Sequence, residues 1–235
     1  MKWSSKAFSV AIGRGLFTFD SSNIVVTDTF HIESLPISAK ILPLNISVEL
    51  TVSQSFLNWP EFHVGAATGL QIRKDCKDLD SSWIVFNQKK TDDGKPDVDA
   101  KHGGFLLGLG LNGHLKNIEL ADSLRYYLLP QHEMVSIGLI LGLGISFIGT
   151  RSVPITQMVS VHIASHLPKN SSTLNTAVSI STAAIVAYGI IYLESNGRFQ
   201  TDKVFGEIAH ATHIDLQSKN ADYECFIIGC GFALV

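Results

Sequence analysis

The sequence predicts a mainly α-helical protein built as an α-solenoid of helical hairpins, with a small antiparallel β segment ahead of it. An eight-residue apolar pattern recurs five times, starting at residues 63, 104, 138, 183 and 225. Recurrence at intervals of roughly 40 residues is typical of solenoids and other repeat arrays. Residues 7–52 instead alternate apolar and polar side chains, which is the periodicity of strands. We therefore expect a β-rich segment over residues 1–57 and about five helical repeats over residues 58–235, the last of them incomplete.

The β segment is predicted from runs such as residues 46–52, in which apolar and polar side chains alternate. Turn-forming residues at 13–15, at 20–23 and at Pro43 divide it into four short strands. Four short strands are marginal as an independent unit. We therefore expect them to pack on another part of the molecule.

Small residues occupy fixed positions of the repeated pattern. The seventh position is Gly in all five copies, and the fifth is Gly or Ala. In a helix, which advances about 100° per residue, the first, fifth and eighth positions share one face and the seventh lies roughly 140° away. Each interior Gly costs about 1 kcal/mol relative to Ala, and close backbone approach on two sides is the physical reason to keep it. The predicted structural repeat glycines are Gly69, Gly104, Gly108, Gly110, Gly138, Gly142, Gly144, Gly189, Gly229 and Gly231.

Leu, Ile, Val and Phe fill most other positions of the pattern, so the repeated helix is apolar all round and is predicted to be buried. A glycine-rich loop is the alternative, and the regular apolar register counts against it. The first buried helix is expected to begin at Trp59-Pro60-Glu61, with Pro60 in its first turn.

Amphipathic helices are expected between the buried ones, because apolar residues there follow an i, i+3, i+4 spacing. Their stripes are Ile118, Ala121, Leu124 and Leu128; Ile155, Met158, Val159, His162, Ile163 and His166; and Val204, Phe205, Ile208 and Ala209. Thr201 is a candidate cap for the last of them. Gly113, Gly149 and Gly197 follow buried helices and are expected to be left-handed C-terminal caps. The charged residues 89–101 predict a solvated or disordered loop.

The composition and motifs favour a protein without catalysis, metal or cofactor. The net charge of −3 offers no basic stripe for nucleic acid, and the three cysteines form no CxxC pair, which fits a reduced intracellular compartment. His162 with His166, and His210 with His213, have the spacing of helical metal ligands. Neither pair contains the Glu of the HExxH pattern, so histidines that pack in the core or at its edge are the preferred interpretation. The sequence also contains no GxSxG, Walker or GxGxxG motif.

A small multi-span membrane protein is one alternative. Residues 134–149 are largely apolar, and Gly138 with Gly142 has the GxxxG spacing of packed transmembrane helices. A span needs about 20 apolar residues, and this run is shorter and bounded by His132-Glu133 and Arg151. The length favours a buried helix and no membrane.

The repeat, with its Gly- or Ala-notched apolar helix, resembles the proteasome/cyclosome repeat family, whose members fold as helical toroids. Several short stretches are similar to the family formed by the largest subunit of the anaphase-promoting complex: Trp59-Pro60-Glu61-Phe62-His63, Gly110-Leu111-Asn112-Gly113-His114-Leu115 and His132-Glu133-Met134. The resemblance is specific from about Trp59 to Pro168 and implies a fragment covering the start of the repeat region. The alternative within the same repeat family is a scaffold subunit of the proteasome regulatory particle.

The resemblance implies a non-catalytic scaffold of a cell-cycle E3 ubiquitin ligase, found in the nucleus and cytoplasm. Its partners would be protein subunits, including the coactivator and the substrate-recognition subunit, held near the catalytic module. The face that binds each partner does not follow from the sequence. Arg125, Gln157 and Lys203 lie on the amphipathic segments and are candidate surface residues, with a solvated face as the alternative for each.

Overall fold

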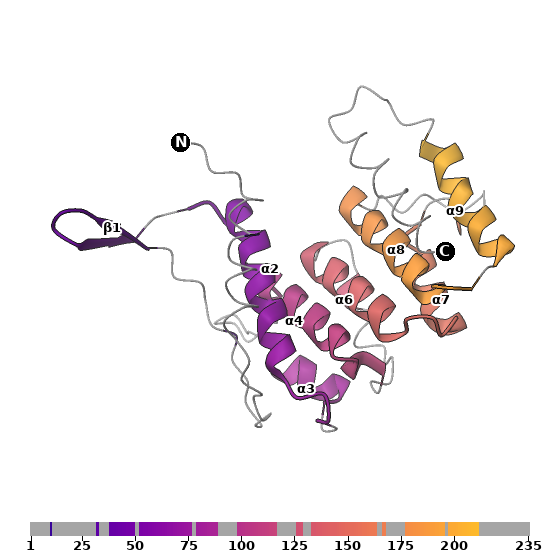
Figure 1. Cartoon of the computed structure of the whole chain (residues 1–235), viewed down its shortest axis with the longest axis horizontal. Coiled ribbons are helices and arrows are strands. Elements are labelled where there is room, and N and C mark those ends of the chain that lie inside the picture. The colour runs from indigo at the N-terminus through magenta and orange to yellow at the C-terminus, as the bar shows by residue number, and fades with distance from the viewer. Residues whose placement is uncertain are drawn as a thin grey trace.

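A computed structural model of the chain describes residues 10, 32, 38–49, 52–76, 79–88, 98–116, 126–128, 133–163, 166–167, 177–195 and 197–211. Four helices form its main layer: α2 (Gln54–Gln71), α4 (Ala100–Leu111), α6 (Glu133–Ser146) and α8 (Val178–Ile191). Each helix packs on the next, α2 on α4, α4 on α6 and α6 on α8, so sequence order is also spatial order (Figure 1). We call these four helices the helix layer. It confirms the predicted mainly helical repeat architecture.

The helix layer holds four of the five copies of the apolar pattern, one in each helix. The helices α4, α6 and α8 are buried along most of their length because most of their side chains are apolar, whereas the buried residues of α2 lie between Pro60 and Gly69. Fully buried examples are Leu106, Leu109, Leu139, Leu143, Ala184 and Ala187. One continuous core therefore runs through the layer instead of a separate core in each repeat.

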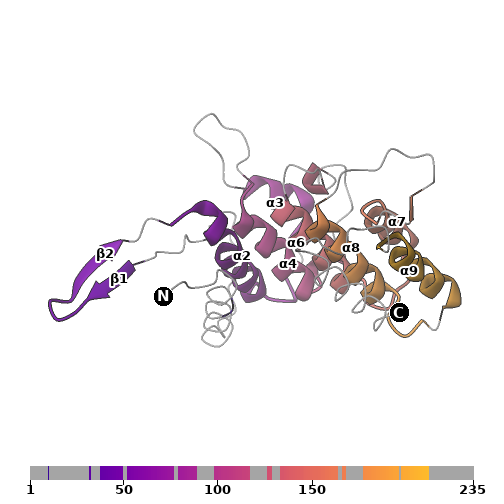
Figure 2. The same cartoon turned by 90° about the horizontal axis from the view of Figure 1, so that it is seen from above.

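The other described helical elements lie between the helices of the layer or, in the case of α9, after the last of them. They are α3 (Ser81–Phe86), the 3-10 turns η1 (His114–Lys116) and η2 (Tyr126–Leu128), α7 (Val153–Ser160) and α9 (Arg198–Ala211). Seen from above, the layer runs from α2 to α8, with α7 and α9 near its α8 end (Figure 2). Ile155 and Val159 of α7 are buried, as the amphipathic stripe predicts, and α7 packs on α8.

Two buried helices begin earlier than predicted. Ser53 precedes the first turn of α2, so Pro60 lies inside that helix and not in its first turn. The predicted loop over residues 89–101 is wrong at its end, because Ala100 and Lys101 belong to α4. The reason is a cap: the Asp99 carboxylate accepts a hydrogen bond from the backbone N–H of His102 at 3.0 Å.

The amphipathic helices also differ from their predicted bounds. α7 ends at Ser160, well before His166, and tighter i+3 turns replace it: the N–H of His162 donates to Val159 and that of Ile163 to Ser160. Such turns are common at helix ends, and the β-branched residues there are weak helix formers.

The third predicted stripe is wrong in two details, since α9 begins at Arg198. Thr201 lies within α9 and donates its hydroxyl to the Gly197 carbonyl at 3.2 Å, so it is not the cap. Phe205 is exposed, whereas its neighbour Val204 is buried as expected.

The glycine caps are confirmed at two of the three predicted positions. Gly113 has φ +83° and Gly149 has φ +65°, so both lie in the left-handed region that favours Gly after a helix. At the end of α8 the left-handed residue is Glu194, with φ 58°, and not Gly197. Gly197 instead precedes α9 and accepts hydrogen bonds from the backbone N–H groups of Gln200 and Thr201.

The described β structure is one antiparallel hairpin, β1 (Ser38–Ile41) with β2 (Ile46–Glu49). It stands apart from the helices in both views (Figures 1 and 2). The described side chains of both strands are exposed, so the expectation that this segment packs elsewhere is not met by the described part of the chain. The other predicted strands lie outside the described residues.

Several further predictions fall outside the described residues. They are the fifth copy of the pattern with Gly229 and Gly231, His213, Arg125, the stripe residues 118–124, and Cys225 and Cys230. The side chains of His210, Ile208 and Ala209 belong to this group as well. Among the described helices, none is both long and apolar enough to cross a membrane.

Candidate functional site

The central feature of the helix layer is direct contact between helix backbones at the small residues of the pattern. A Cβ placed on Gly110 would lie 2.3 Å from the Cα of Gly142, and one on Gly144 would lie 2.7 Å from the Cβ of Ala187. A Cβ on Gly69 would lie 2.9 Å from the Cα of Gly108. In each case the seventh position of one copy meets the fifth position of the next copy. The same rule therefore holds at all three junctions of the layer.

The first and fifth positions face the preceding helix. A Cβ on Gly104 would lie 1.8 Å from the carbonyl oxygen of Phe62, and one on Gly138 would lie 1.8 Å from that of Gly103. A Cβ cannot lie this close to a carbonyl oxygen. Any residue other than Gly at these two positions would therefore require the helix to shift. The two small faces of α4 and of α6 thus contact different neighbouring helices.

The residue numbers of contacting residues rise together along α2 and α4: Gly65 contacts Lys101 and, further along both helices, Gly69 contacts Gly108. In the next pair, Gly138 of α6 contacts Gly103, near the start of α4. The helices of the layer consequently run parallel. Parallel neighbours need a return segment, which is what the shorter elements between them provide.

Side-chain hydrogen bonds fix the first junction at the ends of its helices. The Asn112 amide nitrogen donates to the carbonyl oxygens of Gly69, Leu70 and Ile72 at 3.3, 3.0 and 2.8 Å. The last carbonyls of a helix have no partner within it, so this amide satisfies groups that α2 leaves open. Asn112 therefore fixes how far α4 can slide along α2.

The next two junctions have equivalent ties. The buried Ser146 hydroxyl of α6 donates to the Gly110 carbonyl of α4 at 2.9 Å. After α6, the backbone N–H groups of Gly149 and Arg151 donate to the carbonyls of Ile190 and Ile191 at 3.1 and 3.2 Å. Each pair of neighbouring helices is thus locked at its C-terminal end, by donors from the later helix or the turn after it in the first two pairs and by donors from the turn after the earlier helix, α6, in the third.

A buried histidine lies at the start of α4. His102 packs against Tyr127, with 5.2 Å between ring centroids, and its Nε2 has no hydrogen-bond partner among the described residues. Burial lowers the pKa of His102 to about 4, although the nearby Asp99 carboxylate acts in the opposite direction. The ring is therefore neutral at physiological pH and acts as a core side chain.

The predicted histidine pair His162 and His166 is not on one helix, since α7 ends before both. His162 is buried, which lowers its pKa. The His166 Nδ1 lies 3.2 Å from the Ser160 hydroxyl, and its ring packs edge-on against Tyr188. In the described ranges no group of three metal-ligating side chains comes together.

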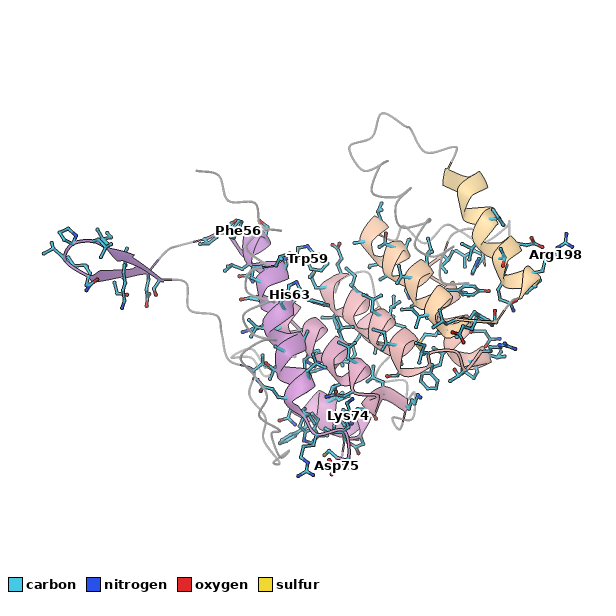
Figure 3. The ribbon with its side chains drawn as sticks, in the orientation of Figure 1. Phe56, Trp59, His63, Lys74, Asp75 and Arg198 are labelled. Atoms are coloured by element: carbon cyan, nitrogen blue, oxygen red, sulfur yellow. The ribbon has the colours of Figure 1, made fainter. Side chains whose placement is uncertain are left out.

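The candidate surface residues that can be placed do not form one site. Gln157 is exposed on α7, and Lys203 lies over the ring of Phe199 in α9, 5.0 Å from its centroid. Figure 3 shows Arg198 at the outer end of α9 and Lys74 with Asp75 at the opposite end of the layer. We therefore take the contact surfaces between neighbouring helices, and not a pocket, as the defining site of this chain.

Sequence reasoning missed the ties made by Asn112, Ser146 and Arg151. Asn112 and Ser146 are polar residues at the end of an otherwise apolar helix, which was a usable signal. Arg151 carried a weaker signal, because its role comes from a backbone N–H. The short helix α3 was missed as well, although Asp80 gives it a capping signal and accepts a hydrogen bond from the N–H of Trp83.

Parallel helices in backbone contact, with return segments between them, define a helical-repeat protein whose core is continuous from one repeat to the next. Residues 1–148 match the family model described as APC1 fourth domain, and residues 153–235 match the model described as APC1 fifth domain. The chain belongs to the APC1 family. The boundary between the two family domains falls in the turn between α6 and α7.

Curated relatives agree with this assignment. The chain is 35% identical over 232 residues to "Anaphase-promoting complex subunit 1" of Schizosaccharomyces pombe, covering 97% of this chain and 15% of that protein. It is 32% identical over 234 residues to the human protein of the same name, covering 97% of this chain and 12% of that protein. "Negative regulator of mitosis" of Emericella nidulans is 33% identical over 235 residues, covering 97% of this chain and 11% of that protein. The chain thus spans only a small part of the length of these relatives.

Proposed function

We propose that this chain is a non-catalytic scaffold segment of the anaphase-promoting complex, a cell-cycle E3 ubiquitin ligase. The observation that carries the proposal is the match to two consecutive family domains, which together span almost the whole chain. The relatives are named as a subunit of that complex and as a regulator of mitosis. The segment would act in the nucleus and cytoplasm, where it would help to position the coactivator and substrate-recognition subunits relative to the catalytic module.

The geometry supports a scaffold role through rigidity. Helices in backbone contact at Gly110 and Gly144, locked at their ends by Asn112 and Ser146, leave little freedom for neighbouring repeats to slide. Coupled nearest-neighbour contacts are what give a repeat array its shape. A rigid array can hold partner proteins at fixed separations, which is the task of a scaffold.

The proposal is tested by affinity purification of the tagged protein from its own cells, followed by mass spectrometry. Other subunits of the anaphase-promoting complex are expected to co-purify in near-equal amounts. Recovery of proteasome subunits instead would favour the other branch of the repeat family. Recovery of chaperones alone would contradict the proposal for this chain.

A further inference from the structure

As the last helix of the layer, α8 carries the same contact face as the two helices before it (Figure 1). The seventh position of the pattern is Gly189 in α8, and it is buried, as Gly110 is in α4 and Gly144 is in α6. The fourth position, three residues earlier on the same face, is half-buried in all three helices. In α4 and α6 this face lies against the next helix of the layer. We call the face around Gly189 the outer face of α8.

The described elements beside α8 do not account for its outer face. Among them, α6 and α7 make the main contacts with α8. The contact with α6 is at Ala187, about 160° round the helix from Gly189 at about 100° per residue. The helix α7 packs on α8 as η2 packs on α6, and η2 leaves Gly144 of α6 free to contact α8. The burial of Gly189 therefore requires a further neighbour on the outer face.

The fifth copy of the pattern, residues 225–232, has the residues that such a neighbour needs. It lies outside the described residues, and its fifth position is Gly229. The fourth and fifth copies start at 183 and 225, an interval of 42 residues, whereas the earlier starts at 63, 104, 138 and 183 give intervals of 41, 34 and 45. Each described junction joins consecutive copies, with the seventh position of one against the fifth of the next. The fifth copy is therefore the segment that this rule assigns to α8.

We propose that the fifth copy docks on the outer face of α8 as the next helix of the layer, with Gly229 against Gly189. The docking continues the series of interfaces that joins α2, α4, α6 and α8. It makes the outer face of α8 part of the array, so this face is not available to a partner protein. The inference does not depend on the proposed function, and either can fail without the other.

The described junctions also set the register of this docking. The first position of a copy contacts the residue just before the preceding copy, as Gly138 contacts Gly103 between α6 and α4, and the junction of α4 with α2 follows the same rule. The first position of the fifth copy is Cys225, and the residue before the fourth copy is Thr182. Thr182 lies two turns before Gly189 and shares its face. The register therefore places Cys225 against Thr182.

A disulfide between these two positions is the first test. Thr182→Cys is introduced into the tagged protein as its own cells make it, and the purified protein is treated with oxidised glutathione and digested without reduction. Two residues with side chains in contact fall within the Cα separation of about 4.4–6.8 Å over which a disulfide forms. We expect mass spectrometry to find the new thiol joined to Cys225. Ser181→Cys is the matched control, because Ser181 is also half-exposed but points about 100° away.

The yield of the link decides between the possible neighbours of α8. Thr182→Cys should give at least about fivefold more of the link to Cys225 than Ser181→Cys, because disulfide geometry is specific. Equal yields from the two variants, or no link from either, would overturn the inference. A new thiol joined only to a cysteine of another segment or of another protein would overturn it as well, and would identify a different neighbour.

A second measurement needs no cysteine. Gly189→Leu and Gly229→Leu should each lower the melting temperature by about 5 °C or more, because each side chain would separate the same two helices. Since the two changes act on one contact, the double variant should lose clearly less than the sum of the two single losses. An unchanged melting temperature with Gly229→Leu, or strictly additive losses in the double variant, would overturn the inference.

Discussion

The helix layer and the hairpin are both rich in aliphatic residues, yet one is buried and the other exposed. Leu139 and Leu143 of α6 are inaccessible to solvent, whereas Leu42 and Leu44 at the tip of the hairpin are almost fully exposed. The difference is one of neighbours. The inner helices α4 and α6 carry small residues on two faces, so each meets another helix of the layer on either side, and α2 and α8 each pack on one of them. The two-stranded hairpin has one apolar face, and the described helices do not cover it.

This contrast shows that apolar composition alone does not determine which residues form the core. The helices become core because a fixed spacing of Gly and Ala allows backbones to touch, which excludes water from the side chains around the contact. The hairpin has no such partner within the described chain. Changes in the layer should therefore alter folding, whereas changes in the hairpin should leave the folding of the layer unaltered.

The largest effect is expected from a side chain placed between two helices. Gly110→Leu would push against the Gly142 backbone and should destabilise the chain by about 3 kcal/mol or more, the upper end of the range for overpacking. At about 2–4 °C per kcal/mol, thermal melting will show the loss clearly. Gly144→Leu should act in the same direction, and Gln157→Leu on the exposed face of α7 is the matched control. Unchanged melting temperatures in both glycine variants would refute the close-packing argument.

A second effect, of up to about 3 kcal/mol, is expected from acid acting on His102. Burial lowers the folded-state pKa of His102 from its ordinary value of 6.5 to about 4, so below pH 6.5 the unfolded chain takes up a proton that the folded chain does not. The free energy of unfolding should therefore fall as the pH drops from 6.5 towards 4. Urea denaturation at pH 7 and at pH 4.5 measures this fall in the free energy of unfolding.

His102→Leu is the control for this pH dependence. The variant should lose part of the difference in stability between pH 7 and 4.5, because His114 and His162, whose pKa values are also lowered by burial, remain in both proteins. An identical pH dependence in the variant and the wild type would show that His102 is not the group responsible.

A smaller effect on the free energy of unfolding is expected from the hydrogen bonds that Asn112, just after α4, makes to the end of α2. Asn112→Ala removes the amide that donates to three carbonyls and should cost about 1–2 kcal/mol. Asn112→Asp should cost more near neutral pH, because a carboxylate would face those same carbonyl oxygens. Thermal melting of both variants at pH 7 is the measurement, and equal melting temperatures for Asp and Ala would contradict this geometry.

The smallest effect on folding is expected in the hairpin. Ile46→Thr alone should change the free energy of unfolding by less than about 0.5 kcal/mol, the usual range for surface positions, because Ile46 contributes nothing to the described core. A large loss measured by urea denaturation would mean that the hairpin is part of the folding unit, and the contrast between the two regions would fail.

Much of the helix layer could be predicted from the sequence, because its signal is local and repeated. The apolar register and the Gly or Ala at the fifth and seventh positions predicted four buried helices that the structure contains. Helix starts were less accurate, as at Gln54 and Ala100: the Asp99 cap fixes the start of α4, whereas α2 begins ahead of the apolar pattern without a side-chain cap. The end of α7 at Ser160 was missed for a related reason, since the stripe continued where weak helix formers gave way to i+3 turns.

The sequence by itself determined that the chain is a repeat protein and which glycines recur, because both follow from the types of residue and their spacing along the chain. The tertiary structure alone decided that the seventh position of one copy meets the fifth of the next, that Asn112 reaches three carbonyls at the end of α2 and just after it, and that His102 is buried. It also decided that the hairpin stands exposed. These facts depend on which elements become neighbours in space, and no local pattern of residues carries that information.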